Sequence, residues 1–142
     1  MQIHLRCDGS AVVVRLKGRL TVGTDFSPLH RLCGQLNRSP GNTIVVDLSQ
    51  VDRMDCTGIG ELVQLHTCAG LAGGEMRIVN VGRFHRELLE MFRLIEPLNV
   101  CSTWRAALRG CESEVGEIRF AWHLPNKPAS SGLAMSERGG ER

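Results

Sequence analysis

The chain of 142 residues lacks a strong excess of charge of either sign, since its formal net charge is only +2. It also lacks a stripe of basic residues interleaved with aromatic ones, which is the usual footprint of nucleic-acid binding. No window approaches the roughly 18–20 apolar residues that a membrane-spanning helix requires. The first ten residues have neither the basic start nor the apolar centre of a signal peptide. We therefore expect a cytoplasmic protein that binds no nucleic acid and does not insert into a membrane.

Metal-binding and catalytic patterns are missing as well. The six cysteines form no CxxC pair and no HExxH motif occurs, so a zinc site has little support. Without a secretion signal, an even number of cysteines does not indicate disulfides, and we expect most of them to be small buried side chains. Gly58 and Gly60 follow a strand, but neither the third glycine of a dinucleotide loop nor a Walker lysine accompanies them. Asp47 lies in a buried-strand pattern and Asp52 in a polar segment, so they suggest no acid–base pair. These observations predict a protein that is not an enzyme and needs no cofactor.

What the chain does contain is an alternation of short apolar strands and amphipathic helices. Hydrophobic residues make up 42% of it, which suits a single globular domain. The expected strands are 2–7, 11–17, 44–48, 76–81 and a short one within 93–100, and the expected helices are 24–36, 57–72, 83–92 and 103–108. This order predicts an α/β fold, in which a mixed, mostly parallel sheet of four to five strands packs with about four helices.

Several local features support this assignment. The turn Asp8-Gly9-Ser10 predicts a hairpin, and residues 18–23 predict a loop. Thr24 or Asp25 is a plausible N-cap for the first helix, with Pro28 in its first turn. Within 83–92, the residues expected to face inward are Phe84, Leu88, Leu89 and Phe92.

The composition changes near residue 110. We expect residues 1–110 to form the domain and residues 111–122 to add an edge strand, because Ile118, Phe120 and Trp122 alternate with polar residues. Residues 123–142 are rich in proline, serine, glycine and charge, which predicts a disordered tail.

The stretch 42–60 carries the most information about function. Its β-branched run 44–48 predicts a strand buried on both faces, and residues 49–53 predict a polar linker. The following helix should present Ile59, Leu62, Val63 and His66 on one face. Thr57 therefore lies at a helix start, where backbone N–H groups are unpaired and negative charge is favoured. On residue type alone, Thr57 predicts a helix N-cap, and Asp55 could cap the same helix.

Four segments in order resemble a STAS domain, the family of bacterial anti-sigma factor antagonists and of sulfate-transporter C-terminal domains. They are GRLTVG at 18–23, IVVDL at 44–48, MDCTGIGEL at 54–62 and GGEM at 73–76. The resemblance covers about residues 3–109 and centres on a loop similar to Asp-Ser-Ser/Thr-Gly-Leu/Ile-Gly. Two positions depart from the family pattern: Cys56 replaces the first loop hydroxyl, and Thr21 stands where many antagonists carry an acidic residue.

The resemblance implies a stand-alone anti-sigma factor antagonist. In such members a serine/threonine kinase that doubles as the anti-sigma factor phosphorylates the second loop hydroxyl, which is Thr57 here. The dephosphorylated form binds that kinase, and a PP2C-type phosphatase resets the switch. The partner-binding residues implied by position are Thr21, Thr24, Asp55, Cys56, Gly58, Gly60, Glu61 and Gln64.

Two alternatives remain open. Within the same fold, the chain could be a STAS subunit of a larger assembly, such as a lipid-transport ABC complex, that binds the ATPase without a phosphorylation cycle. In a different class, it could be a small enzyme or redox sensor that uses Cys56, since a helix start lowers the pKa of a nearby thiol.

Overall fold

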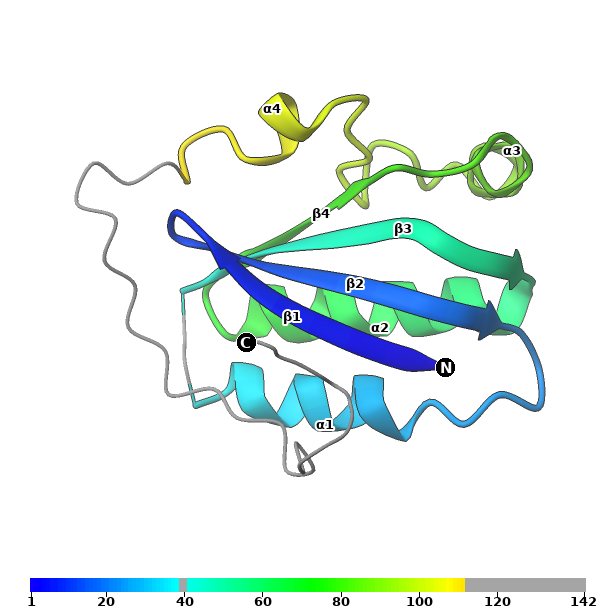
Figure 1. The fold of residues 1–142 in the computed structure, drawn as a ribbon, viewed down its shortest axis with the longest axis horizontal. Helices are drawn as coiled ribbons and strands as arrows, with labels where there is room; N and C mark the ends of the chain where they lie inside the picture. The colour runs from blue at the N-terminus through cyan, green and yellow to red at the C-terminus, as the bar shows by residue number, and fades with distance from the viewer. Residues whose placement is uncertain (39–40, 112–142) are drawn as a thin grey trace.

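Four strands form one sheet in the order β1-β2-β3-β4 (Figure 1). The computed structural model describes residues 1–38 and 41–111. Its elements are β1 (Gln2–Asp8), β2 (Ala11–Leu20), α1 (Ser27–Leu36), β3 (Thr43–Met54), α2 (Cys56–Leu71), β4 (Glu75–Val79), α3 (Arg83–Met91) and α4 (Trp104–Ala107). β1 pairs antiparallel with β2, whereas β2, β3 and β4 run parallel. The mixed, mostly parallel α/β fold predicted from the sequence is confirmed. The added strand and the tail predicted beyond Cys111 lie outside the described residues.

The fifth strand expected within 93–100 does not form. Val100 makes only an isolated bridge with Ile78, through the Ile78 N–H to the Asn99 carbonyl at 3.1 Å and the Cys101 N–H to the Ile78 carbonyl at 2.7 Å. Arg93 and Asn99 have φ angles of 57° and 55°. Because such left-handed residues interrupt an extended backbone, the segment contacts β4 only briefly.

β2 and β3 are longer than the sequence pattern predicts. Residues 18–20 and 49–53, expected as loop and linker, belong to these two strands and pair with each other. The pairing of β2 with β3 shifts register twice, after Arg15 and after Gly18, and at each shift β3 has one residue more than β2. The predicted boundaries were wrong because polar residues on a solvent-facing, bulged strand resemble a loop.

The core lies mainly between the sheet and the helices α1 and α2, which Figure 1 shows on one side of the strands. The strands contribute alternate buried residues and the helices contribute leucines: Val12, Val14, Leu16, Ile44, Val46, Leu48, Leu29, Leu32, Leu62 and Leu65. A smaller cluster lies on the opposite face, where Ala107 and Cys111 pack on Val13, Val45 and Val79. The two faces of the sheet are therefore covered unequally by the described residues.

Several side chains face differently from the sequence prediction. Phe84 and Phe92 are 81% and 46% exposed, so the expectation that they face inward was wrong, whereas Leu89 is buried. α3 follows the last strand at the edge of the sheet, so only one narrow side of it meets the core. In α2, Leu65 and Ala69 are buried and Val63 is exposed. The buried face of this helix therefore differs from the predicted one, which included Val63. The prediction that most cysteines are buried was wrong: only Cys111 is buried, and none of the six forms a disulfide within the described residues.

The helix starts confirm part of the prediction. Pro28 lies in the first turn of α1, but the N-cap is Phe26 rather than Thr24 or Asp25. Asp25 still accepts the Ser27 N–H, at 3.0 Å. Thr103 caps α4, and its hydroxyl accepts the Ala106 N–H at 3.0 Å.

Candidate functional site

Asp55, not Thr57, is the N-cap of α2. Its backbone is extended, and its Oδ1 accepts the Thr57 N–H at 2.9 Å and the Gly58 N–H at 3.2 Å. The N-cap interpretation of Thr57 is therefore wrong, and the one for Asp55 is confirmed. Thr57 is the second residue of the helix and is exposed. Within residues 1–38 and 41–111, its hydroxyl has no hydrogen-bond partner.

The other oxygen of Asp55 joins the helix start to the loop that follows β2. Oδ2 accepts the Val22 N–H at 3.0 Å, and the Asp55 N–H donates to the Leu20 carbonyl at 3.1 Å. One carboxylate thus fixes two segments that lie 33 residues apart in the chain. The family resemblance implied that Thr21 and Thr24 share a binding surface with residues 55–60, and these hydrogen bonds bring the two segments together.

The loop has its own turn. The Thr24 N–H donates to the Thr21 carbonyl at 3.1 Å, the two threonine hydroxyls lie 3.4 Å apart, and Gly23 has a φ of 89°. Thr21 and Thr24 are half-buried, whereas Val22, which lies between them in the chain, is 75% exposed. Sequence reasoning did not single out Val22, although an apolar residue within a turn next to a glycine was a signal for it.

Gly58 allows α2 to begin against the end of β2. A Cβ at this position would lie 2.1 Å from the Leu20 carbonyl oxygen and 2.6 Å from the Leu20 Cβ. Only glycine fits there without moving the backbone. Gly60, in contrast, is exposed and has open space around its Cα, so it leaves that side of the helix accessible.

The remaining predicted residues lie along the first two turns of α2. Cys56 and Gln64 are exposed. Glu61 has a side chain that is 18% exposed and lies 3.0 Å from His30 Nε2 on α1. Sequence reasoning did not connect His30 with this site, because the contact joins two helices that are separate in the chain.

Backbone N–H groups dominate the electrostatics of the site. The Val22 N–H is the main cause that lowers the pKa of the Asp55 carboxyl below its ordinary value. Burial opposes it, and the N–H groups of Gly58 and Thr57 lower the pKa further. Asp55 is therefore ionised at neutral pH, and both of its oxygens already accept hydrogen bonds. In the described part of the chain, no cluster of three or more His, Cys, Asp or Glu could hold a metal ion, and no helix is long and apolar enough to cross a bilayer.

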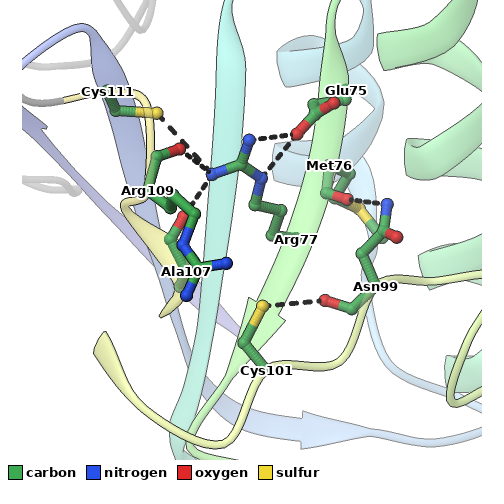
Figure 2. Close-up of polar contacts among 8 residues, drawn as sticks. All are labelled: Glu75, Met76, Arg77, Asn99, Cys101, Ala107, Arg109 and Cys111. Atoms are coloured by element: carbon green, nitrogen blue, oxygen red, sulfur yellow. Dashed lines mark hydrogen bonds and ion pairs between the residues drawn. The ribbon is translucent and has the colours of Figure 1, made fainter. Parts of the chain in front are cut away.

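A pocket of about 450 Å³ lies elsewhere, between β4 and residues 95–101. Figure 2 shows that Arg77, which lines it, is fully engaged: Nη1 donates to the carbonyls of Ala107 and Arg109 at 2.8 and 2.7 Å, and Glu75 pairs with the rest of the guanidinium. These contacts fix the end of α4 to the sheet. None of the predicted site residues lines this pocket.

The fold and the loop together define a small mixed α/β domain that presents an exposed threonine on the first turn of an aspartate-capped helix. The chain belongs to the STAS domain family, whose model matches residues 2–107. The resemblance drawn from the sequence is thereby confirmed. No curated protein matches the chain.

Solved structures with the same fold include anti-sigma factor antagonists and a sulfate transporter family protein. An anti-sigma factor antagonist from Mycobacterium paratuberculosis is 20% identical, with 77% of this chain and 92% of that one covered and a TM-score of 0.65. The Bacillus cell fate determinant SpoIIAA in its phosphorylated form is 18% identical, with 75% and 96% covered and a TM-score of 0.54. A sulfate transporter family protein from Wolinella succinogenes is 20% identical, with 68% and 80% covered and a TM-score of 0.55.

Proposed function

We propose that this protein is an anti-sigma factor antagonist-like regulator that binds a serine/threonine kinase-type anti-sigma factor and is switched by phosphorylation of Thr57. The observation that carries the proposal is the exposed Thr57 side chain, whose hydroxyl makes no hydrogen bond within the described residues while its own N–H is held by Asp55. A kinase needs such a hydroxyl, fixed in place by its backbone and open to solvent. The fold shared with a protein described as the phosphorylated form of SpoIIAA supports the same interpretation.

The local contacts indicate how a phosphate would act. It would add about −1.5 to −2 charges and three acceptor oxygens. A helix start normally stabilises an anion by about 0.3–1 kcal/mol. Here, however, Asp55 already accepts the N–H groups of Thr57 and Gly58, so the dianion would meet a carboxylate rather than free donors. We therefore infer that the phosphate points outward and acts by repelling the docked partner, not by rearranging the fold.

The proposed docking surface surrounds Thr57. It combines the loop of residues 21–24, the helix start and the first turns of α2: Thr21, Thr24, Asp55, Cys56, Gly58, Gly60, Glu61 and Gln64. Of these, Gly58 is buried and acts by letting the helix start approach β2, and Glu61 is held by His30. Val22 adds an exposed apolar contact to this set, because the Asp55 carboxylate holds its backbone beside the helix start. The protein acts in the cytoplasm by binding rather than by catalysis, and a PP2C-type phosphatase returns it to the binding-competent state.

The test uses the full chain and each purified serine-kinase-type anti-sigma factor encoded in the source genome, with ATP and magnesium. We expect intact mass spectrometry to show one added phosphate on the wild type and on Thr67→Ala, but none on Thr57→Ala. Thr67 is a matched control because it is exposed on the same helix and its hydroxyl donates to the Val63 carbonyl at 3.0 Å.

The outcome also separates the alternatives. A phosphate on Thr57→Ala would place the acceptor elsewhere. Stable co-purification with a transporter ATPase, without phosphate from any kinase, would favour a subunit of a lipid-transport ABC complex. Oxidation of Cys56 by dilute peroxide that changes binding would favour a redox sensor.

A further inference from the structure

The sheet face opposite α1 and α2 carries a group of basic side chains that come from two strands. On β2, Leu16 and Leu20 are buried on the helix side, so Lys17 and Arg19 between them point to the other face, where both are exposed. On β3, Arg53 is also exposed and lies directly opposite Arg19 in the register. We call Lys17, Arg19 and Arg53 the basic patch.

The basic patch makes no ion pair of 4 Å or less within residues 1–38 and 41–111, although the exposed Asp52 precedes Arg53 in β3. Arg15, one step back along β2, pairs with Asp47 at 2.9 Å, but Lys17, Arg19 and Arg53 make no ion pair within the described residues. Lys17 faces the neutral Gln50, and Arg19 faces another arginine. Like charges directly opposite each other destabilise a sheet, so the fold gains nothing from this arrangement.

The positive charge on this face of the sheet also affects a neighbouring histidine, His4. His4 on β1 lies opposite Arg15, next to the Gln2–Lys17 pair. Burial and then the charges of Lys17 and Arg15 lower the pKa of His4 below its ordinary value.

The basic patch is also continuous with the proposed docking surface. Leu20 follows Arg19 and leads directly into the loop of residues 21–24, and Met54 follows Arg53 and leads into Asp55. The two loops are joined by the Asp55–Val22 hydrogen bond of 3.0 Å. A partner that covers Thr57 and Val22 could therefore reach the patch without crossing another element.

We propose that Lys17, Arg19 and Arg53 bind an acidic surface of the partner kinase, as a second half of the docking surface. This inference rests on the proposed function and adds the chemistry of the partner. Charge complementarity speeds encounter and fixes orientation, which suits a switch that must bind and release. Release follows as well, because a dianion on Thr57 repels an acidic partner surface that extends from the helix start to the patch.

The experiment reverses the charges in the full chain. Lys17→Glu, Arg19→Glu and Arg53→Glu are made singly and together, and Arg31→Glu serves as the control because Arg31 is equally exposed on α1, on the other side of the sheet. Association with the kinase found by the phosphorylation assay is measured by stopped flow at low and high salt. Circular dichroism confirms that each variant is folded.

We expect the triple variant to associate at least about tenfold more slowly at low salt, within the range attributed to electrostatic steering. We also expect its salt dependence to reverse, because three glutamates repel an acidic partner surface and added salt screens that repulsion, while Arg31→Glu behaves as the wild type. An unchanged rate at both salt concentrations, with Thr57 still phosphorylated, overturns the role of the patch and leaves the proposed function intact.

If wild-type Thr57 receives no phosphate and no kinase binds, the proposed function itself fails. Binding of phosphatidylserine vesicles or duplex DNA that the triple variant loses, with kinase association unchanged, assigns the patch to a different partner and also overturns the inference.

Discussion

Asp47 and Asp55 lie eight residues apart, one within β3 and one just after its end, and the carboxylate of each joins segments that are distant in the chain. Asp47 is fully buried and accepts hydrogen bonds from Arg15 Nε at 2.9 Å, Asn80 Nδ2 at 3.0 Å and the Ser49 N–H at 2.9 Å. Asp55 accepts from three backbone N–H groups at the solvent-facing helix start. Both carboxyls have a lowered pKa. For Asp47, burial raises it, and the bonds from Asn80, Ser49 and Arg15 outweigh that effect; for Asp55, the Val22 N–H is the main cause.

The two carboxylates differ in what the chain loses when each is removed. If the fully buried Asp47 is removed, Arg15, Asn80 and the Ser49 N–H lose at once the acceptor that joins β2, β3 and the residue after β4. If Asp55 is removed, water can reach the freed N–H groups. Similar hydrogen bonding therefore serves stability at the first site and positioning of a loop at the second.

The largest expected effect follows from Asp47. We expect Asp47→Ala to lower the free energy of unfolding by about 3 kcal/mol, because it removes three hydrogen bonds to a charged group, each worth about 1.5–3 kcal/mol before water partly replaces them, in urea titrations followed by circular dichroism. Asp52→Ala, at an exposed position of the same strand, is the control. A loss smaller than that of Asp55→Ala would break the distinction between the two carboxylates.

The next effect concerns the backbone contact beneath Asp55. Gly58→Ala should destabilise the fold by about 1–3 kcal/mol, the usual range for overpacking, because the new Cβ overlaps the Leu20 carbonyl. Gly60→Ala, on the same helix with open space around it, should be neutral or stabilise by roughly 0.5–1 kcal/mol. Equal thermal midpoints for the two variants would show that α2 does not need its close approach to β2.

A smaller effect is expected for Asp55→Asn, and it should depend on pH. Because the folded-state pKa of Asp55 is lowered, its contribution to stability is present above the ordinary pKa of about 3.9 and is lost as the pH falls through the folded-state value. Thermal midpoints between pH 7 and pH 2 should therefore fall less steeply for the variant than for the wild type. Hydrogen exchange at the Val22 amide should be faster in the variant at neutral pH, and unchanged exchange there would contradict the link between loop and helix.

The smallest effect belongs to the basic patch. Neutralising one member of the facing pair, in Arg53→Gln, should stabilise the fold by a few tenths of a kcal/mol, since it removes like-charge repulsion across the strands. Arg31→Gln on α1 is the control. A fall in the thermal midpoint would mean that Arg53 makes a stabilising contact, which would weaken the argument for a functional role.

The prediction of the fold succeeded where apolar periodicity was strong. The run 44–48 and the hairpin turn at Gly9 identified the centre and the edge of the sheet, and both are observed. It failed where polar residues continue a strand, as in 49–53, and where an apolar residue stays exposed, as with Phe84. Local pattern cannot distinguish a bulged, solvent-facing strand from a loop, because both are polar and only the pairing partner differs.

The candidate site was predicted through residue order rather than geometry. The position of Thr57 at a helix start, the nearby loop of residues 21–24 and the capping option for Asp55 came from the sequence. The roles of Val22, His30 and Arg53 did not, because each depends on a contact or register between segments distant in the chain.

The sequence by itself determined the family, the order of strands and helices and the hydroxyl at the start of α2, since these depend on residue type and spacing along the chain. Only the tertiary structure decided that Asp55 rather than Thr57 caps the helix, which leaves the Thr57 hydroxyl free of hydrogen bonds within the described residues. It also brought Arg19 opposite Arg53. The physical reason is that hydrogen bonds and charge interactions act over a few ångströms in space, and the chain reaches those distances only after it has folded.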